Sequence, residues 1–423
     1  MQKINVNNNK LSADTEFYAK KWGFLFHEFA LWLLYHCQQQ NLKKLYFFTR
    51  EGAFFIKLVK AFQIRFNLYA EIECHLLSVS RMTTFLASVD MDDDNPFQRL
   101  WNVYPDQSPQ AFFKSLDIED ECLQQIYQQE YAGNFSSKIP NIAINPIFKH
   151  YLKNVNVNFI IKQAIAAKKE LLTTYLKQNT FFNDTSVGVV DIGWRGSIQD
   201  NLSLIFPEKT IYGFYLGLHR FRGTFIPANQ FKKAFLFNAN TGRIIQPLTS
   251  LMRFVLPLEM LCTPPALGSV KRYKLDENHR ALPETQHNTV EKIILGKIIE
   301  TFQQTVLKDL SSYQFNNQFR YRKSKKIAKQ IIWDPQAFQL FVYHNHKFDE
   351  EFGLGNATQA YPADLSDQAI QSMKAKTAWI KALKESAWIS GFLYNKLPKS
   401  LFRALPILYL LYSLLTFDNY LLP

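Results

Sequence analysis

Cysteine is scarce in this chain, with 4 in 423 residues. The four are Cys37, Cys74, Cys122 and Cys262. Because they are far apart and show no paired spacing, they form neither the ligand pattern of a zinc site nor a disulfide framework. Residues 1–10 are polar and rich in asparagine, so they lack the apolar centre of a secretory signal. We therefore expect a protein of a reducing, cytoplasmic compartment.

Long apolar runs and nucleic-acid-binding modules are also lacking. The apolar stretch at residues 406–417 is shorter than the about 20 residues that cross a bilayer. The formal net charge of +13 suits an anionic partner, which we expect to be a phosphorylated substrate or a membrane face and not a nucleic acid. A hydrophobic content of 47% with 37 Phe and 20 Tyr excludes general disorder.

What the chain does contain is a β-branched apolar run at residues 187–192, followed by a glycine loop. The run is typical of a short buried strand, and residues 198–206 have the pattern of a helix. The loop between them reads Gly193, Trp194, Arg195, Gly196 and Ser197. In such a unit the glycines let backbone N–H groups approach an anion, and the helix N-terminus adds partial positive charge.

Three side chains of this unit suit a phosphorylated ligand. Asp191 lies at the carboxyl end of its strand, where ligands bind in open α/β sheets. Arg195 supplies a cation and Ser197 a hydroxyl group. The alternative is an ordinary tight turn with a surface arginine, because the spacing matches neither the dinucleotide fingerprint nor the Walker loop.

Two earlier strands are also predicted to end in arginines. The strand at residues 45–48 is followed by Thr49, Arg50, Glu51 and Gly52, and then by a helix over residues 53–66. The strand predicted at residues 75–81 ends on Ser80 and Arg81. If the two strands are neighbours in a parallel sheet, Arg50 and Arg81 converge into a clamp for an oxyanion. Each could instead be a common surface arginine.

The element order predicts an α/β fold with a Rossmann-like, mostly parallel sheet. Residues 210–217 and 234–237 are predicted to be further strands, and residues 83–177 an inserted helical subdomain. The acidic run at residues 92–94 could mimic metal-binding acids, but a solvated loop is the simpler interpretation. We expect a core over residues 1–273 and a helical, basic C-terminal region over residues 274–423.

Two features of the later sequence leave alternatives open. Glu259 precedes a Pro/Gly-rich loop at residues 263–270, where it could be a general base, an acceptor-binding group or a turn cap. In the tail, aromatic residues such as Trp379 and Trp388 alternate with lysines before the apolar stretch at residues 406–417. That pattern suits an interfacial membrane contact, or a terminal helix that docks on the core.

The loops around Arg50, Arg81 and Asp191, in this order and spacing, resemble a family of bacterial surface-polysaccharide enzymes, the glycan phosphoribosyltransferases of O-antigen and capsule synthesis. The resemblance covers about residues 22–273, and the Asp191 loop is its most specific part. It implies transfer of a 5-phosphoribosyl unit from phosphoribosyl pyrophosphate to a hydroxyl of a lipid-linked or growing glycan. Such domains often accompany a haloacid-dehalogenase-type phosphatase, whose nucleophile motif is lacking here, so we expect a separate phosphatase chain.

The resemblance also implies roles for the site residues. The loop from Gly193 to Ser197 would bind the 5-phosphate, and Asp191 would bind the ribose hydroxyls and favour positive charge at C1. Arg50 and Arg81 would hold the pyrophosphate, with Mg²⁺ as the expected cofactor. Glu51 or Glu259 would be the base, although the family usually has Asp where Glu51 stands. The remaining residues expected to contact substrate are Gly52, Ser80, Trp194, Arg195, Gly196, Gln199 and Ser269.

Two other functions fit the same sequence. One is a glycosyltransferase that uses a different donor, such as a nucleotide sugar. The other is a non-catalytic subunit that binds glycan or phosphate within a polysaccharide assembly complex.

Overall fold

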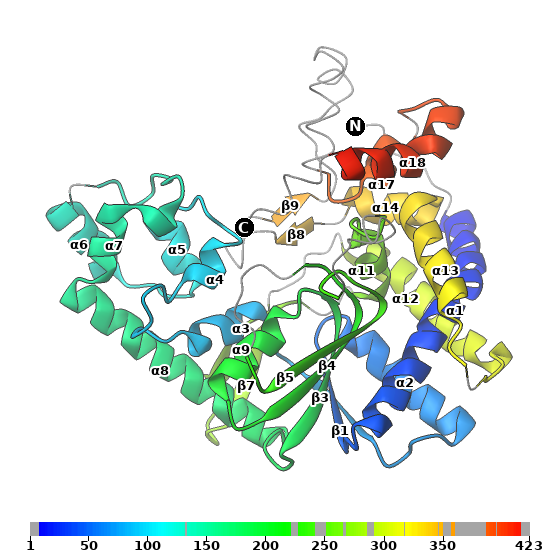
Figure 1. Ribbon diagram of the computed structural model, residues 1–423, viewed down its shortest axis with the longest axis horizontal. Coiled ribbons are helices and arrows are strands. Elements are labelled where there is room, and N and C mark those ends of the chain that lie inside the picture. Colours follow the sequence, from blue (N-terminus) through cyan, green and yellow to red (C-terminus); the bar gives the residue numbers. More distant parts are fainter. Residues whose placement is uncertain are drawn as a thin grey trace.

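The computed structural model describes residues 8–131, 133–220, 227–241, 251–264, 268–285, 292–316, 318–345, 347–349, 357–359, 386–394 and 396–415. Its centre is a five-stranded parallel sheet with the order β2-β1-β3-β4-β5 (Figure 1). The strands are β1 (Lys44–Phe48), β2 (Glu73–Leu77), β3 (Ser186–Trp194), β4 (Thr210–Leu218) and β5 (Gln230–Asn238). This sheet confirms the predicted Rossmann-like α/β fold.

Alternate residues along the strands face two different layers, as the period of two of a strand requires. Phe47 and Val190 belong to a large core shared with α1 (Asn8–Gln39), whereas Tyr46 and Val189 pack on the other side against α8 (Val155–Gln178) and α9 (Ser197–Ile205). Strands buried on both faces read as continuous apolar runs, which explains the sequence of β3. The helices of the large core are α1 (Asn8–Gln39), α2 (Gly52–Phe66), α11 (Leu256–Cys262), α12 (Lys292–Asp309), α13 (Tyr321–Trp333), α14 (Ala337–Asn345), α17 (Ile389–Leu393) and α18 (Lys399–Leu415).

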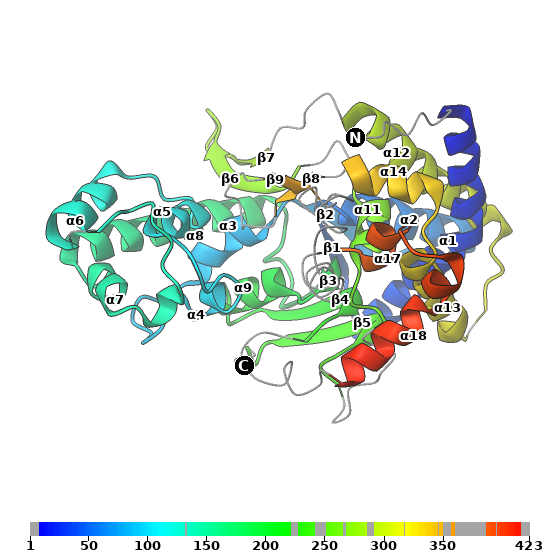
Figure 2. The same ribbon diagram turned by 90° about the horizontal axis from the view of Figure 1, so that it is seen from above.

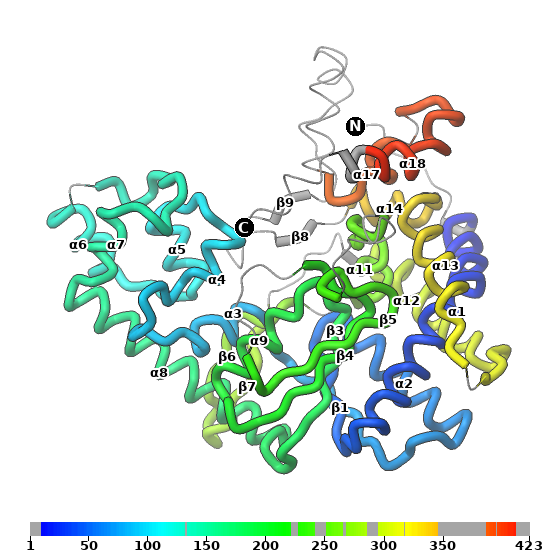
Figure 3. The backbone as a smooth tube through the Cα atoms, viewed as in Figure 1, coloured from blue at the N-terminus to red at the C-terminus, as the bar shows by residue number. Residues whose placement is uncertain are grey.

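The predicted helical insertion follows β2 and returns the chain to β3. It has an apolar core of its own and lies to one side of the sheet, away from α1 and α12 (Figures 1 and 2). Its last and longest helix leads back to the central strand, as the chain trace shows (Figure 3). The elements are α3 (Arg81–Phe85), η1 (Leu86–Ser88), α4 (Gln98–Trp101), α5 (Pro109–Ser115), α6 (Glu121–Tyr131), η2 (Ile142–Ile144), α7 (Pro146–Leu152) and α8 (Val155–Gln178), and β3 is followed by α9 (Ser197–Ile205).

The strand predicted at residues 75–81 is shorter than expected, because β2 ends at Leu77. Ser80 is instead the N-cap of α3: its hydroxyl accepts from the Thr83 N–H, and the Thr83 side chain accepts from the Ser80 N–H. Arg81 is therefore the first residue of a helix and not the last residue of a strand. The acidic run at residues 92–94 is an exposed loop, as the simpler interpretation predicted.

The C-terminal region is not purely helical. Residue 273, the expected boundary, lies inside β6 (Val270–Leu275), which forms an antiparallel hairpin with β7 (Ala281–Thr285). The helices α12, α13 and α14 share one core with α1. The remaining elements are η3 (Leu310–Ser312), β8 (Lys347–Asp349) and β9 (Ala357–Gln359).

Part of the predicted membrane-contact segment lies outside the described residues, namely Trp379 and residues 416–417. None of the described helices combines the length and the apolarity needed to cross a bilayer.

Candidate functional site

The strand order creates a topological switch point between β1 and β3. The sheet continues from β1 to β2 on one side, and from β3 to β4 and β5 on the other. In open parallel sheets, ligands bind outside the carboxyl ends of the strands at such a point. The loop that leaves β1 there carries Arg50 and Glu51, and Asp191 lies within β3 near its carboxyl end. The charges of these three residues act on one another.

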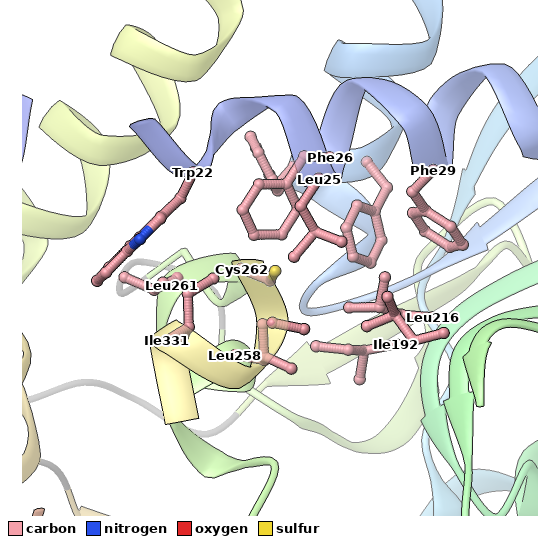
Figure 4. Close-up of a cluster of buried hydrophobic side chains, with 14 of the residues drawn as sticks. Trp22, Leu25, Phe26, Phe29, Ile192, Leu216, Leu258, Leu261, Cys262 and Ile331 are labelled. Atoms are coloured by element: carbon pink, nitrogen blue, oxygen red, sulfur yellow. The ribbon is translucent and has the colours of Figure 1, made fainter. Parts of the chain in front are cut away.

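The helix α11 brings Glu259 to the same group. Apolar side chains of α11, among them Leu258 and Leu261, meet those of α1 and of the ends of β3 and β4 in one core (Figure 4). This packing fixes the helix, so that the carboxylate of Glu259 lies beside the β1 and β3 loops.

Arg50 is the cation of the group and faces three acids. Its Nη2 lies 3.1 Å from Glu259 Oε1 and 3.4 Å from Glu51 Oε1. The carboxylate of Glu51, followed by those of Glu259 and Asp191, raises the pKa of Arg50 above its ordinary value. The prediction was that Arg50 and Arg81 together bind an oxyanion. In the structure Nη2 of Arg50 already contacts two carboxylates, so this atom is engaged within the protein.

The two candidate bases have different surroundings. The Glu51 side chain is only 5% exposed and accepts a hydrogen bond from Thr263 Oγ1 at 2.7 Å. The Glu259 side chain is 26% exposed, and its Oε2 accepts from Trp194 Nε1 at 3.1 Å. Burial, and then the charge of Glu51, raises the pKa of Glu259. Glu259 is thus oriented by two donors and still reaches solvent.

Asp191 is half-buried beside these acids. Its Oδ1 accepts from the Ile192 N–H at 2.8 Å. Burial, followed by the nearby charge of Glu51, raises the pKa of Asp191 to about 8. At neutral pH the carboxyl group is therefore mostly protonated, and a cation placed beside it would favour its ionised form.

The glycine loop before α9 is shorter than predicted, because β3 continues through Gly193 and Trp194 and only Arg195 and Gly196 separate it from α9. Gly193, Trp194 and Gly196 have φ values of 116°, 67° and 67°. A Cβ on Gly193 would collide with the carbonyl oxygen of Gly217, and one on Gly196 would lie 2.6 Å from Tyr215 Oη. Only glycine fits these two positions, and Gly196 is also the N-cap residue of α9. The N-terminus of α9 thus follows β3 after two residues, and the N-terminus of a helix favours anions.

Arg195 lies between β3 and α9, Ser197 is the first residue of α9, and both are half-buried. The Arg195 carbonyl accepts from Lys232 Nζ at 3.2 Å, and Lys232 also pairs with Asp200 at 2.6 Å. The charge of Arg195 contributes, after burial, to lowering the pKa of His219 to about 4. His219 is therefore neutral at pH 7 and lies beside the Trp194 ring, with 5.8 Å between centroids.

Two of the predicted substrate contacts have internal roles instead. Gln199 is fully buried: its Nε2 donates to the carbonyls of Ile211 and Phe231, and its Oε1 accepts from Tyr215 Oη. A Cβ on Gly52 would lie 2.9 Å from the Phe47 backbone, so this glycine allows α2 to pack closely on β1. The side chain of Gln199 is thus engaged in internal hydrogen bonds, and Gly52 has a packing role.

Ser80, Arg81 and Ser269 lie where the β2 loop meets the hairpin. Ser80 Oγ donates to the Val270 carbonyl at 2.6 Å, so the hydroxyl ties the two segments together. Arg81 is exposed, and its charge acts on Glu259, which places it at the rim of the carboxylate group. Ser269 is half-buried and directly precedes β6.

Comparison with protein-family models and with curated proteins finds no match.

Thr263 and His219 were missed by sequence reasoning. Thr263 follows Glu259 by four residues and caps α11, since its hydroxyl also contacts the Glu259 carbonyl at 2.9 Å. A helix-end spacing of this kind is a visible signal, but the contact with Glu51 spans 212 positions and depends on tertiary packing. His219 directly follows β4, and no local motif distinguishes it.

No group of three or more His, Cys, Asp or Glu side chains in the described part of the chain is arranged to hold a metal ion. Mg²⁺ in phosphate-transfer sites is bound by one or two carboxylates together with the phosphates of the substrate. Asp191 fits that requirement as a single carboxylate, because Glu51 and Glu259 are engaged by Arg50.

Proposed function

We propose that this protein is a glycan phosphoribosyltransferase that uses phosphoribosyl pyrophosphate as its donor. The observation that carries the proposal is the group of Asp191, Arg50 and Glu259 at the switch point, directly beside a glycine loop at a helix N-terminus. A phosphoribosyl donor has two separate anionic groups and a ribose between them. In this proposal the glycine loop would bind one of these anionic groups and the arginine rim the other.

In this proposal the 5-phosphate binds the glycine loop, where backbone N–H groups and Arg195 balance its charge. The pyrophosphate lies at the rim formed by Arg81 and by the Nη1 side of Arg50. Asp191 would hold Mg²⁺ together with the donor's phosphates, and the bound ion would neutralise charge on the leaving group. Ser197 and Ser269 remain proposed hydroxyl contacts to the donor or the acceptor.

The chemical step is a displacement at C1 of the ribose. The glycan hydroxyl oxygen forms a bond to C1, and the bond between C1 and the pyrophosphate oxygen breaks with both electrons leaving on pyrophosphate. The proton of the hydroxyl passes to Glu259, whose raised pKa strengthens it as a base. The ionised form of Asp191 stabilises positive charge that develops at C1. Glu51 acts indirectly, because its ion pair with Arg50 holds that side chain in position.

The helix α18 supports a proposed contact with the inner face of a membrane. It buries Leu405 and Tyr409 in the core, where the Tyr409 ring lies 5.6 Å from that of Trp333. Leu401, Ile407, Leu408 and Leu411 of this helix are exposed. Lys399 and Arg403 are exposed on the same helix. Exposed apolar residues beside cations suit the surface of an anionic membrane, where a lipid-linked acceptor would be found.

Donor selectivity tests the proposed function. Calorimetric titration with phosphoribosyl pyrophosphate and Mg²⁺ should give saturable binding, while ribose 5-phosphate binds more weakly and UDP-sugars do not compete. Arg81→Lys should weaken the binding of phosphoribosyl pyrophosphate more than the binding of ribose 5-phosphate, because the guanidinium fork is lost while the charge remains. Arg322→Lys, an exposed arginine on α13, is the matched control. Tighter binding of a UDP-sugar would favour a nucleotide-sugar glycosyltransferase, and binding without turnover a non-catalytic subunit.

A further inference from the structure

A second group of cations lies on the opposite side of α1 from the candidate site. Trp22, Phe26 and Phe29 point from α1 into the core with α11 (Figure 4). At 100° per residue, Lys20, Phe24 and His27 form the opposite stripe of the same helix. This stripe lines a cavity of about 280 Å³ together with the turn after α12 and the start of α13.

The cavity is strongly cationic. Its lining includes Lys20, Lys21, Arg320 and Lys323, against a single carboxylate, that of Asp309. Among the described residues, the three lysines make no ion pair. A second cavity, of about 440 Å³ between η1 and α8, has Asp90 and Asp92 against Lys162 and Lys169 and so carries no such excess of charge.

Arg320 is held in the cavity by a buried acid. Glu28 has no exposed surface, and it accepts from the Arg320 backbone N–H at 2.8 Å and from Nε at 2.9 Å and Nη2 at 2.6 Å of the same side chain. Tyr313 Oη donates to the same carboxylate at 2.6 Å. The guanidinium is therefore positioned before any ligand arrives, which reduces the entropy lost on binding.

Two cations lie against the ring of Phe24, which also lines the cavity. Lys323 Nζ is 3.7 Å and Arg320 Cζ 4.5 Å from the centroid of Phe24. The two charges are thus separated by no more than about one Debye length at physiological salt, about 8 Å, and repel each other. The ring offsets part of this repulsion, and an anion between the cations would offset the rest.

We propose that this cavity binds a phosphate group, carried by a small soluble molecule or by a lipid headgroup. A phosphate dianion matches the excess of cations, and a fixed guanidinium with flexible lysines is a common set of phosphate donors. The volume is at the lower end of the range for ligand sites, which suits a phosphate with a small substituent. The proposal does not depend on the proposed transfer reaction.

The test uses the full-length protein with Arg50→Gln, which weakens phosphate binding at the sheet edge. Inorganic phosphate is titrated by calorimetry at low salt into this background and into versions that also carry Lys20→Gln and Lys323→Gln. The control carries Lys325→Gln and Lys326→Gln, two exposed lysines of α13 that do not line the cavity. Lys21→Gln is a milder second variant, and circular dichroism and melting curves check that each protein is folded.

We expect at least a tenfold loss of phosphate affinity for Lys20→Gln with Lys323→Gln, a smaller loss for Lys21→Gln, and none for the control. Sedimentation with phosphatidylcholine vesicles containing phosphatidic acid then separates the two sources. Sedimentation that is lost in the variant with Lys20→Gln and Lys323→Gln identifies a lipid headgroup as the carrier of the phosphate. Phosphate binding without sedimentation identifies a soluble ligand. Equal losses in the cavity variant and the control, or no saturable binding in the Arg50→Gln background, would overturn the proposal.

Discussion

Replacing Asp191 with asparagine should stabilise the protein while it abolishes transfer. The pKa of this carboxyl group is raised from 3.8 to about 8 by burial and by the charge of Glu51. The pKa of Asp191 is higher in the folded than in the unfolded state. Its contribution to the free energy of unfolding is therefore most favourable below about pH 3.8 and is lost as the pH rises through about 8. Asparagine carries no charge, so the variant escapes that loss.

The magnitude follows from the size of the shift. One pKa unit corresponds to about 1.4 kcal/mol, so the shift of roughly four units sets an upper limit of about 5–6 kcal/mol above pH 8. Solvent reaches the half-buried carboxyl group and Glu51 can relax, which reduces the expected gain to about 1–3 kcal/mol at pH 7–8. The melting temperature should rise by roughly 2–6 °C.

The assay is thermal and urea unfolding of both proteins at pH 4, 6 and 8. The advantage of Asp191→Asn should be near zero at pH 4 and should grow toward pH 8. Asp200→Asn is the matched control, because Asp200 pairs with Lys232 at 2.6 Å and its replacement should destabilise. A stability difference for Asp191→Asn that does not change with pH, or a variant less stable than the wild type at pH 8, would refute the reasoning.

Three further predictions test other parts of the site and the tail. Glu259→Gln should lower kcat about 10²- to 10⁴-fold in a steady-state assay and leave the Kd of the donor nearly unchanged. Glu51→Gln should mainly lower the melting temperature. If both variants lose the same activity and keep the same stability, the separate roles given to Glu259 and Glu51 are wrong. Gly193→Ala should cost about 1–3 kcal/mol in urea unfolding because of its φ of 116° and the Gly217 carbonyl; an unchanged midpoint would contradict this. The double variant Leu401→Glu, Leu408→Glu should keep the fold yet abolish sedimentation with anionic vesicles. Deletion of residues 400–423 should lower the melting temperature because Tyr409 leaves the core. Wild-type protein that does not sediment with vesicles at low salt would contradict the membrane proposal.

Local patterns were enough to predict the sheet. The β-branched run of β3, the glycine loop and α9 follow from periodicity and backbone requirements that act over a few residues. The end of β2 was misplaced because Ser80 caps a helix through Thr83, where the familiar signal is Glu or Gln at that position. The hairpin of β6 and β7 was missed because its turn, fixed by Asp276 Oδ1 accepting from Asn278 and Arg280, lacks the usual Asn-Gly signal.

The site could be predicted only as far as single strands allow. That Arg50 and Asp191 lie together follows from the rule for strand ends, and the structure has their strands as neighbours. That Trp194 and Arg50 share the carboxylate of Glu259 depends on where α11 packs, which no local pattern specifies. Gln199 was predicted to contact substrate because it belongs to the Asp191 motif of the resemblance, but the period of the helix turns it toward the sheet.

Mass analysis of a transfer reaction tests the central claim most directly. The full-length protein is incubated with phosphoribosyl pyrophosphate, Mg²⁺ and a panel of synthetic glycan acceptors, beside Glu259→Gln and Asp191→Asn as folded controls. The account predicts an acceptor that gains one phosphopentosyl unit, with stoichiometric release of pyrophosphate, in the wild-type protein alone. No product from this donor, together with glycosyl transfer from a nucleotide sugar that also requires Glu259, would contradict it.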